Sequence, residues 1–168
     1  MQTSKKYTST TFCFQSKYEP EQIWELLIDP IRNNGFKKNQ CYYNEIDSSF
    51  KLEKNHSWKE IHTGESCKGD IVKNTIKKIT PYSYFKTVRY QAGIKNTSIY
   101  TLEKNAAGTL IAEQQKFVFS LRNFSLSAII LWIMLVTGLL TKLGFKPEED
   151  LFWYENMEDA IEKSLLKT

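Results

Sequence analysis

The chain has 168 residues, of which 41% are hydrophobic and 25% charged, which is enough for one compact domain and excludes a disordered chain. The net charge is +4, but residues 1–122 carry 19 Lys and Arg against 12 Asp and Glu, whereas residues 123–168 carry 4 against 7. Because the lysines of the first part alternate with acids, we expect no nucleic-acid partner, and a solvated sheet face or a weak attraction to an anionic membrane surface explains them.

The N-terminal part of the sequence predicts a strand followed by a short helix. Residues 7–15 are rich in Thr, Phe and Tyr, as strands are. A proline at position 20, between two glutamates, then favours a helix N-terminus. Apolar residues at helical spacing follow it, namely Ile23, Trp24, Leu27 and Ile28. We expect Asp29-Pro30 to end this helix, and residues 31–49 fit either a second short helix or an irregular crossing.

Strand-like segments separated by turn residues occupy the middle of the chain. They span residues 50–53, 56–62, 69–79, 82–91, 97–104 and 109–121. Their regular spacing predicts an antiparallel meander instead of βαβ units. In the last segment both sets of alternating side chains mix polar and apolar residues. This pattern is typical of a sheet with a partly polar concave face, or of a strand that extends past its neighbours.

An apolar segment follows the strands, because the seventeen residues 124–140 contain no charge. A membrane span, a lid or buried interface, and a reversible membrane contact all remain open as interpretations. A span would separate the sheet from the helix that follows, which the core needs. We therefore favour a lid or docking segment over residues 123–146, with lid or membrane-contact residues at Ile130, Trp132, Leu135, Leu139 and Phe145.

The C-terminal residues predict a long amphipathic helix. Pro147 opens it, acids occupy its first turn and lysines its last. The apolar stripe contains Leu151, Tyr154, Met157, Ile161 and Leu165. A helix of this kind needs a sheet to cover, so we expect one domain over residues 1–168.

Three short motifs and the order of the elements resemble the START-like superfamily, also called SRPBCC, Bet v 1-like or polyketide cyclase/dehydrase-like. Residues Tyr18 to Trp24 (YEPEQIW) and Leu27 to Pro30 (LIDP) look like the first helix of that family. Residues Ile79 to Pro81 look like its turn before an aromatic strand, and Asn105 to Thr109 like the start of a long strand. The resemblance implies an α+β fold of the helix-grip type, in which a curved antiparallel β-sheet wraps around a long C-terminal helix.

The same resemblance implies a cavity between the sheet and that helix, in which such proteins bind apolar small molecules. We therefore expect a hydrophobic ligand, a lipid, and no cofactor. From the predicted facing of the strands and the helix, the lining residues are Trp58, Tyr84, Tyr90, Tyr100, Phe117, Tyr154, Met157 and Ile161. The alternatives are a cyclase- or dehydratase-like enzyme that uses Glu60, Glu113 or His62, and a membrane-associated interaction module without a ligand.

Groups with catalytic or metal-binding chemistry are few. His56 and His62 are too far apart on one strand for a metal ion unless a bulge intervenes, so we expect edge or surface histidines and no metal site. For Glu60, Glu103 and Glu113 we expect outward positions beside neighbouring lysines. Nothing in the sequence requires catalysis, and we assign no catalytic residue.

Cysteine usage and the N-terminus indicate a compartment. Three cysteines without a CxxC spacing fit neither a disulfide framework nor a zinc site, and no apolar signal segment follows the first lysines. We expect a cytoplasmic protein. As partners of the apolar segment we consider the inner face of the membrane and a second copy of the chain, bound as a homodimer through residues 124–140.

Overall fold

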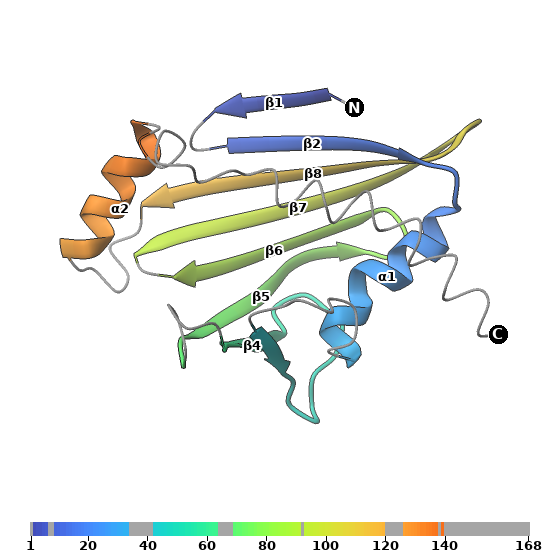
Figure 1. Cartoon of the computed structure of the whole chain (residues 1–168). Helices are drawn as coiled ribbons and strands as arrows, with labels where there is room; N and C mark the ends of the chain where they lie inside the picture. Colours follow the sequence, from blue (N-terminus) through green and yellow to red (C-terminus); the bar gives the residue numbers. More distant parts are fainter. Residues whose placement is uncertain are drawn as a thin grey trace.

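The computed structural model describes residues 2–6, 9–33, 42–63, 69–91, 93–119, 126–137 and 139. The strands there are β1 (Gln2–Lys6), β2 (Ser9–Ser16), β3 (Tyr42–Glu45), β4 (Ser57–His62), β5 (Ile71–Thr80), β6 (Tyr84–Gln91), β7 (Ile94–Asn105) and β8 (Gly108–Phe119). The helices are α1 (Pro20–Asn33) and α2 (Leu126–Val136), as Figure 1 shows. The predicted C-terminal helix lies outside the described residues.

The strands form one curved antiparallel sheet in the order β1-β2-β8-β7-β6-β5-β4-β3. Strands β3 to β8 run as a meander, which confirms the prediction. Strand β2 closes back on β8, so that Ser16 pairs with Thr109. Strand β1, which the sequence did not indicate, extends the sheet beyond β2.

Helix α1 begins at Pro20, as predicted, because the Glu19 amide donates to the side chain of Gln22 at 3.1 Å and caps the first turn. The predicted end at Asp29-Pro30 is wrong, since the helix continues to Asn33. A proline near a helix end removes only one hydrogen bond, and the packed turns before it hold the backbone in place. Of the segment 31–49, for which a second short helix or an irregular crossing was predicted, the first residues belong to α1, residues 34–41 lie outside the described residues, and β3 begins at Tyr42.

The predicted strand at residues 50–53 is also wrong, because local hydrogen bonds bend the chain there. The Ser49 amide donates to the Asp47 carboxylate at 2.8 Å, and the Phe50 amide donates to the Asp47 carbonyl. Asn55 has a φ of 71°, which no strand residue adopts. Phe50 serves the core instead, edge-on to Trp58 at 6.2 Å.

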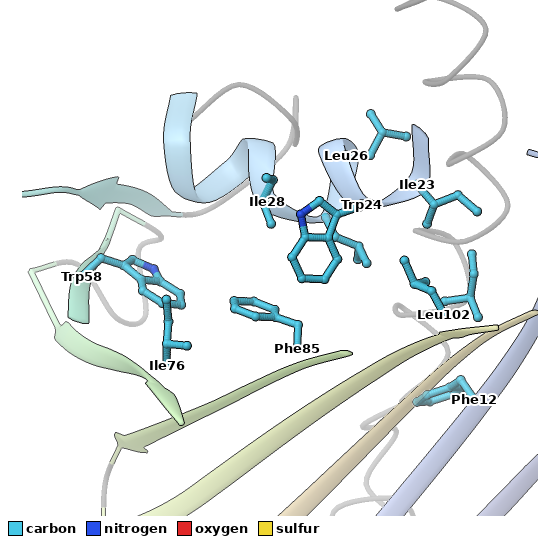
Figure 2. Packing of buried hydrophobic residues seen from close by; sticks show 11 residues of the cluster. Phe12, Ile23, Trp24, Leu26, Ile28, Trp58, Ile76, Phe85 and Leu102 are labelled. Atoms are coloured by element: carbon cyan, nitrogen blue, oxygen red, sulfur yellow. The ribbon is translucent and has the colours of Figure 1, made fainter. Parts of the chain in front are cut away.

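The core lies between α1 and the inner face of the sheet (Figures 1 and 2). Trp24 of α1 packs edge-on against Phe85 of β6, with ring centroids 6.1 Å apart. The helix contributes Ile23, Trp24, Leu26, Leu27 and Ile28, and the sheet contributes Phe12, Trp58, Ile76, Phe85, Leu102 and Ile111. These side chains fill the end of the sheet nearest α1.

Helix α2 lies at the other end of the sheet, beside the end of β8 (Figure 1). Trp132 contacts Phe119 of β8, with ring centroids 6.2 Å apart. In the part of the chain that the structure describes, no helix is long and apolar enough to cross a membrane.

Candidate functional site

The candidate site is the part of the inner sheet face that continues from the core toward α2. Alternation along each strand sends every second side chain to this face. The register aligns Glu60 of β4 with Val72, Asn74 of β5 with Arg89, and Arg89 of β6 with Asn96 of β7. Polar side chains of four strands therefore share one face with the apolar core.

Four of these side chains form a group that we term the Glu60 cluster: Glu60, His62, Asn74 and Arg89. The Asn74 amide donates to Glu60 Oε2 at 3.3 Å, and Arg89 Nη1 donates to Oε1 at 3.4 Å. His62 Nε2 lies 3.0 Å from the same oxygen. The Glu60 side chain is only 8% exposed, whereas that of Arg89 is 36% exposed. A buried carboxylate needs partners of this kind, and the cluster supplies them while leaving the Arg89 guanidinium partly exposed.

A second group, the Glu113 cluster, lies on β7 and β8. The Tyr100 hydroxyl and the Gln115 amide both donate to Glu113 Oε1 at 2.8 Å. Glu113 is buried, and the Tyr100 ring stacks on Phe85 at 6.5 Å. The cluster thus places hydroxyl, amide and carboxylate groups directly beside the apolar core.

Asn96 lies between the two clusters, aligned with Arg89 on one side and Phe117 on the other. It is buried, and within the described residues its Oδ1 accepts no hydrogen bond. A buried acceptor without a donor costs about 1–3 kcal/mol. A bound molecule with a hydroxyl or N–H group would satisfy it.

The structure divides the residues that were predicted to line a cavity. Trp58, Tyr100 and Phe117 share the inner face, because their registered partners include the buried Asn74, Glu113 and Asn96. Tyr84 and Tyr90 alternate with Phe85 and Arg89, so they occupy the outer face, where Lys78 lies over the Tyr84 ring. The expected placement of these two tyrosines is therefore corrected. Tyr154, Met157 and Ile161 lie outside the described residues.

The expected outward position of the acids is wrong for Glu60 and Glu113, which are buried on the inner face, while Glu103 is exposed. The lysine beside Glu60, Lys59, pairs with Glu45 instead. The lysine beside Glu103, Lys104, pairs with Glu19. The two buried acids do not form a catalytic pair, since β5, β6 and β7 separate their strands by about 19 Å along the sheet.

Of the two histidines, His62 is mostly buried against Glu60 and is not the surface residue that was expected. His56 is half-buried, and its Nδ1 accepts from the Lys51 amide at 3.1 Å. The described part of the chain contains no group of three or more potential metal ligands.

Three polar residues of this face were not predicted from the sequence: Asn74, Arg89 and Asn96. One of them, Asn74, carried a usable signal, because it falls between Val72 and Ile76 at strand spacing, just as Glu60 follows Trp58. A polar residue that shares one face of a strand with two large apolar residues indicates a polar group on the core face. Arg89 and Asn96 follow only from the strand register.

The predicted lid residues gather at α2 only in part. Ile130 is 52% exposed and Leu139 is also exposed, whereas Trp132 is half-buried against Phe119. The side chain of Leu135 and the whole of Phe145 lie outside the described residues. Ile130 also belongs to a stripe with Leu126 and Ile133, all exposed on one side of the helix.

In comparisons with known proteins, this chain is similar in fold to solved structures and matches nothing else. No protein-family model and no curated protein matches the sequence. An Arthrobacter aurescens protein solved by NMR is similar over 96% of this chain and 91% of its own, with 10% identity and a TM-score of 0.64. The Mycobacterium smegmatis protein Ms6760 is similar over 98% of both chains, with 14% identity and a TM-score of 0.61. Ara h 8.0201, a Bet v 1 homologue, is similar over 92% of this chain and 97% of its own, with 10% identity and a TM-score of 0.61.

Proposed function

Because this chain has the Bet v 1-like helix-grip fold, we propose that it binds an amphipathic small molecule, a lipid, against the inner face of its sheet. The observation that carries the proposal is the buried polar surface on that face. Glu60, Arg89 and Asn96 lie where a domain without a ligand would place apolar side chains. The apolar part of the ligand would contact Tyr100 and Phe117.

The proposal includes the cavity that the sequence analysis predicted between the sheet and the C-terminal helix. Tyr154, Met157 and Ile161 remain its predicted lining on the helix side. An apolar wall with a few convergent polar groups is typical of small-molecule sites. The polar groups would fix the orientation of the ligand, with an anionic or carbonyl oxygen at Arg89 and a donor at Asn96.

Native mass spectrometry of gently purified protein tests this function directly. We expect a lipid-sized adduct that is lost on denaturation. The apolar sulfonate 1-anilinonaphthalene-8-sulfonate (ANS) serves as a probe of defined chemistry, because its sulfonate suits Arg89 and its rings suit Tyr100. The absence of both a lipid adduct and saturable ANS binding would contradict the proposal.

The finer part of the proposal is a reversible membrane contact through α2. Its stripe of Leu126, Ile130 and Ile133 exposes large aliphatic side chains, and Leu126 is 73% exposed. Exposed apolar stripes of this kind mark partner or membrane surfaces. Replacing Ile130 and Ile133 by Asp should abolish sedimentation with phosphatidylcholine vesicles. A homodimer through the same stripe is the alternative, and sedimentation velocity without vesicles distinguishes it.

A second function is favoured by the Glu60–His62 contact of 3.0 Å. A buried imidazole beside a carboxylate can accept and return a proton, which a cyclase or dehydratase requires. In a dehydration, His62 would take a proton from carbon, a carbon–carbon double bond would form as the C–O bond breaks, and the imidazolium would return that proton to the leaving hydroxyl, which departs as water. If the protein catalyses this step, the ligand recovered from a His62→Asn variant should be heavier by one water than the wild-type ligand. Identical ligand masses would leave only the binding function.

A further inference from the structure

The outer face of the sheet concentrates positive charge. Among the described residues of β2 to β8, strand alternation places the lysines Lys59, Lys73, Lys78, Lys86, Lys95 and Lys116 on this face. The same alternation adds only two acids, Glu45 and Glu103. The excess of lysines that the sequence spreads along residues 1–122 therefore gathers on one surface.

Some of these lysines lie directly opposite each other on neighbouring strands, which lowers the stability of the protein when no anion is bound. Lys59 is the registered partner of Lys73, and Lys78 is that of Lys86. Like charges directly opposite on neighbouring strands repel. Glu45 relieves this repulsion only at Lys59, at 3.2 Å. An anion lying across the face would relieve it at the other lysines.

Three of the lysines lie near the end of the sheet that carries α2, and we term them the end lysines: Lys73, Lys95 and Lys116. Lys95 follows the first residue of β7, Lys73 is the third residue of β5, and Lys116 is three residues before the end of β8. Because the sheet is antiparallel, the starts of β5 and β7 and the end of β8 lie at the same end of the sheet, beside which Figure 1 shows α2.

Exposed aliphatic side chains accompany the end lysines on the same face. Ile71 is 62% exposed, and Val118, the registered partner of Lys95, is 54% exposed. With the α2 stripe, this end of the molecule combines cations and large apolar side chains. Such a combination fits a lipid bilayer, where lysines meet anionic headgroups and aliphatic chains enter the acyl boundary. A nucleic acid would satisfy the lysines but not the aliphatic side chains.

We infer that the end lysines, with Ile71 and Val118, dock this end of the sheet onto a bilayer surface that contains anionic phospholipid. This inference rests on the proposed membrane contact of α2 and adds the lipid charge and a second surface. The outer face thereby selects the membrane, while the inner face holds the small molecule. Each lysine near an anionic surface strengthens binding about fivefold at low ionic strength, and salt weakens it.

Co-sedimentation with vesicles tests the inference. The wild-type chain is compared on phosphatidylcholine vesicles and on vesicles that also contain phosphatidylserine. We expect the partition coefficient to be higher on the anionic vesicles and to fall as salt is added. The variant Lys73→Gln/Lys95→Gln/Lys116→Gln should lose about a hundredfold on anionic vesicles and nothing on neutral ones.

The matched control is Lys51→Gln/Lys54→Gln/Lys77→Gln, which removes the same charge from exposed sites away from the α2 end. It should bind anionic vesicles as the wild type does, and thermal unfolding should show both variants folded. Equal losses in the two variants would overturn the inference in favour of net charge alone. Equal wild-type binding to neutral and anionic vesicles would overturn it while leaving the α2 contact intact. No wild-type binding to either vesicle would overturn both, and tighter binding to an RNA oligonucleotide than to anionic vesicles would overturn the choice of partner.

Discussion

The imidazole of His62 and the carboxylate of Glu60 lie side by side on the inner face of β4, with Nε2 3.0 Å from Oε1. The two residues are separated by Ile61, so strand alternation alone brings them to one face. Arg89 from β6 approaches the same oxygen at 3.4 Å. One carboxylate thus joins two strands that are not neighbours in the sheet.

This arrangement makes Glu60 important for stability. Replacement of Glu60 by Gln removes the anion and leaves Arg89 without its counter-ion in a partly buried site. We expect the free energy of unfolding to fall by about 1–3 kcal/mol, less than for a fully buried pair because water screens Arg89. Urea denaturation measures it. The control Glu103→Gln, at an exposed acid, should change stability by less than about 0.5 kcal/mol; equal stability of the two variants would show that the cluster contributes nothing.

Asn96 should behave in the opposite way. We expect this residue to lower the stability of the ligand-free protein and to contribute to ligand binding. Asn96→Leu keeps the number of side-chain heavy atoms and the branch at Cγ, and it removes an acceptor without a donor among the described residues. We expect the free energy of unfolding to rise by about 1 kcal/mol while the dissociation constant for ANS increases. A less stable Leu variant would mean that the amide already has partners in the free protein.

The two faces of the sheet predict different effects for two similar substitutions. Tyr100→Phe removes the hydroxyl that donates to Glu113 at 2.8 Å and should weaken ANS binding severalfold. Tyr84→Phe keeps the ring under Lys78 on the outer face and should leave ANS binding unchanged. ANS titrations of the two variants compare the faces directly. A larger effect at Tyr84 than at Tyr100 would argue against a ligand on the inner face.

Gly108 is required by the close approach of two chain segments. It has a φ of 116°, and a Cβ there would meet the Ser16 carbonyl oxygen and lie 2.7 Å from the Lys17 carbonyl carbon. We expect Gly108→Ala to lower the free energy of unfolding by about 3 kcal/mol or more, since backbone strain and a clash add. Gly69 has a φ of 88° but open space around its Cβ position. Thermal unfolding of Gly69→Ala should therefore show only the strain, about 1 kcal/mol.

The sequence by itself determined the elements whose signals are local. Pro20 marks the start of α1, where the Gln22 side chain accepts from the Glu19 amide, and turn residues at regular intervals separate the strands of a meander. Where a local signal was overruled, the reason is packing or hydrogen bonding nearby. Pro30 lies inside α1, and the hydrogen bonds of Asp47 bend the chain before Phe50, which then reaches Trp58.

Only the tertiary structure decided which face each strand residue occupies. The sequence of β8 mixes polar and apolar residues on both parities, so nothing in it distinguishes Glu113 on the core face from Lys116 on the outer face. Strand pairing decides it, because one residue of shift in register would exchange the two faces. For the same reason the tyrosines at positions 84 and 100 cannot be separated by composition. The physical cause is that burial of a strand side chain depends on neighbours distant in the chain, whereas helix starts and turns depend on residues beside them.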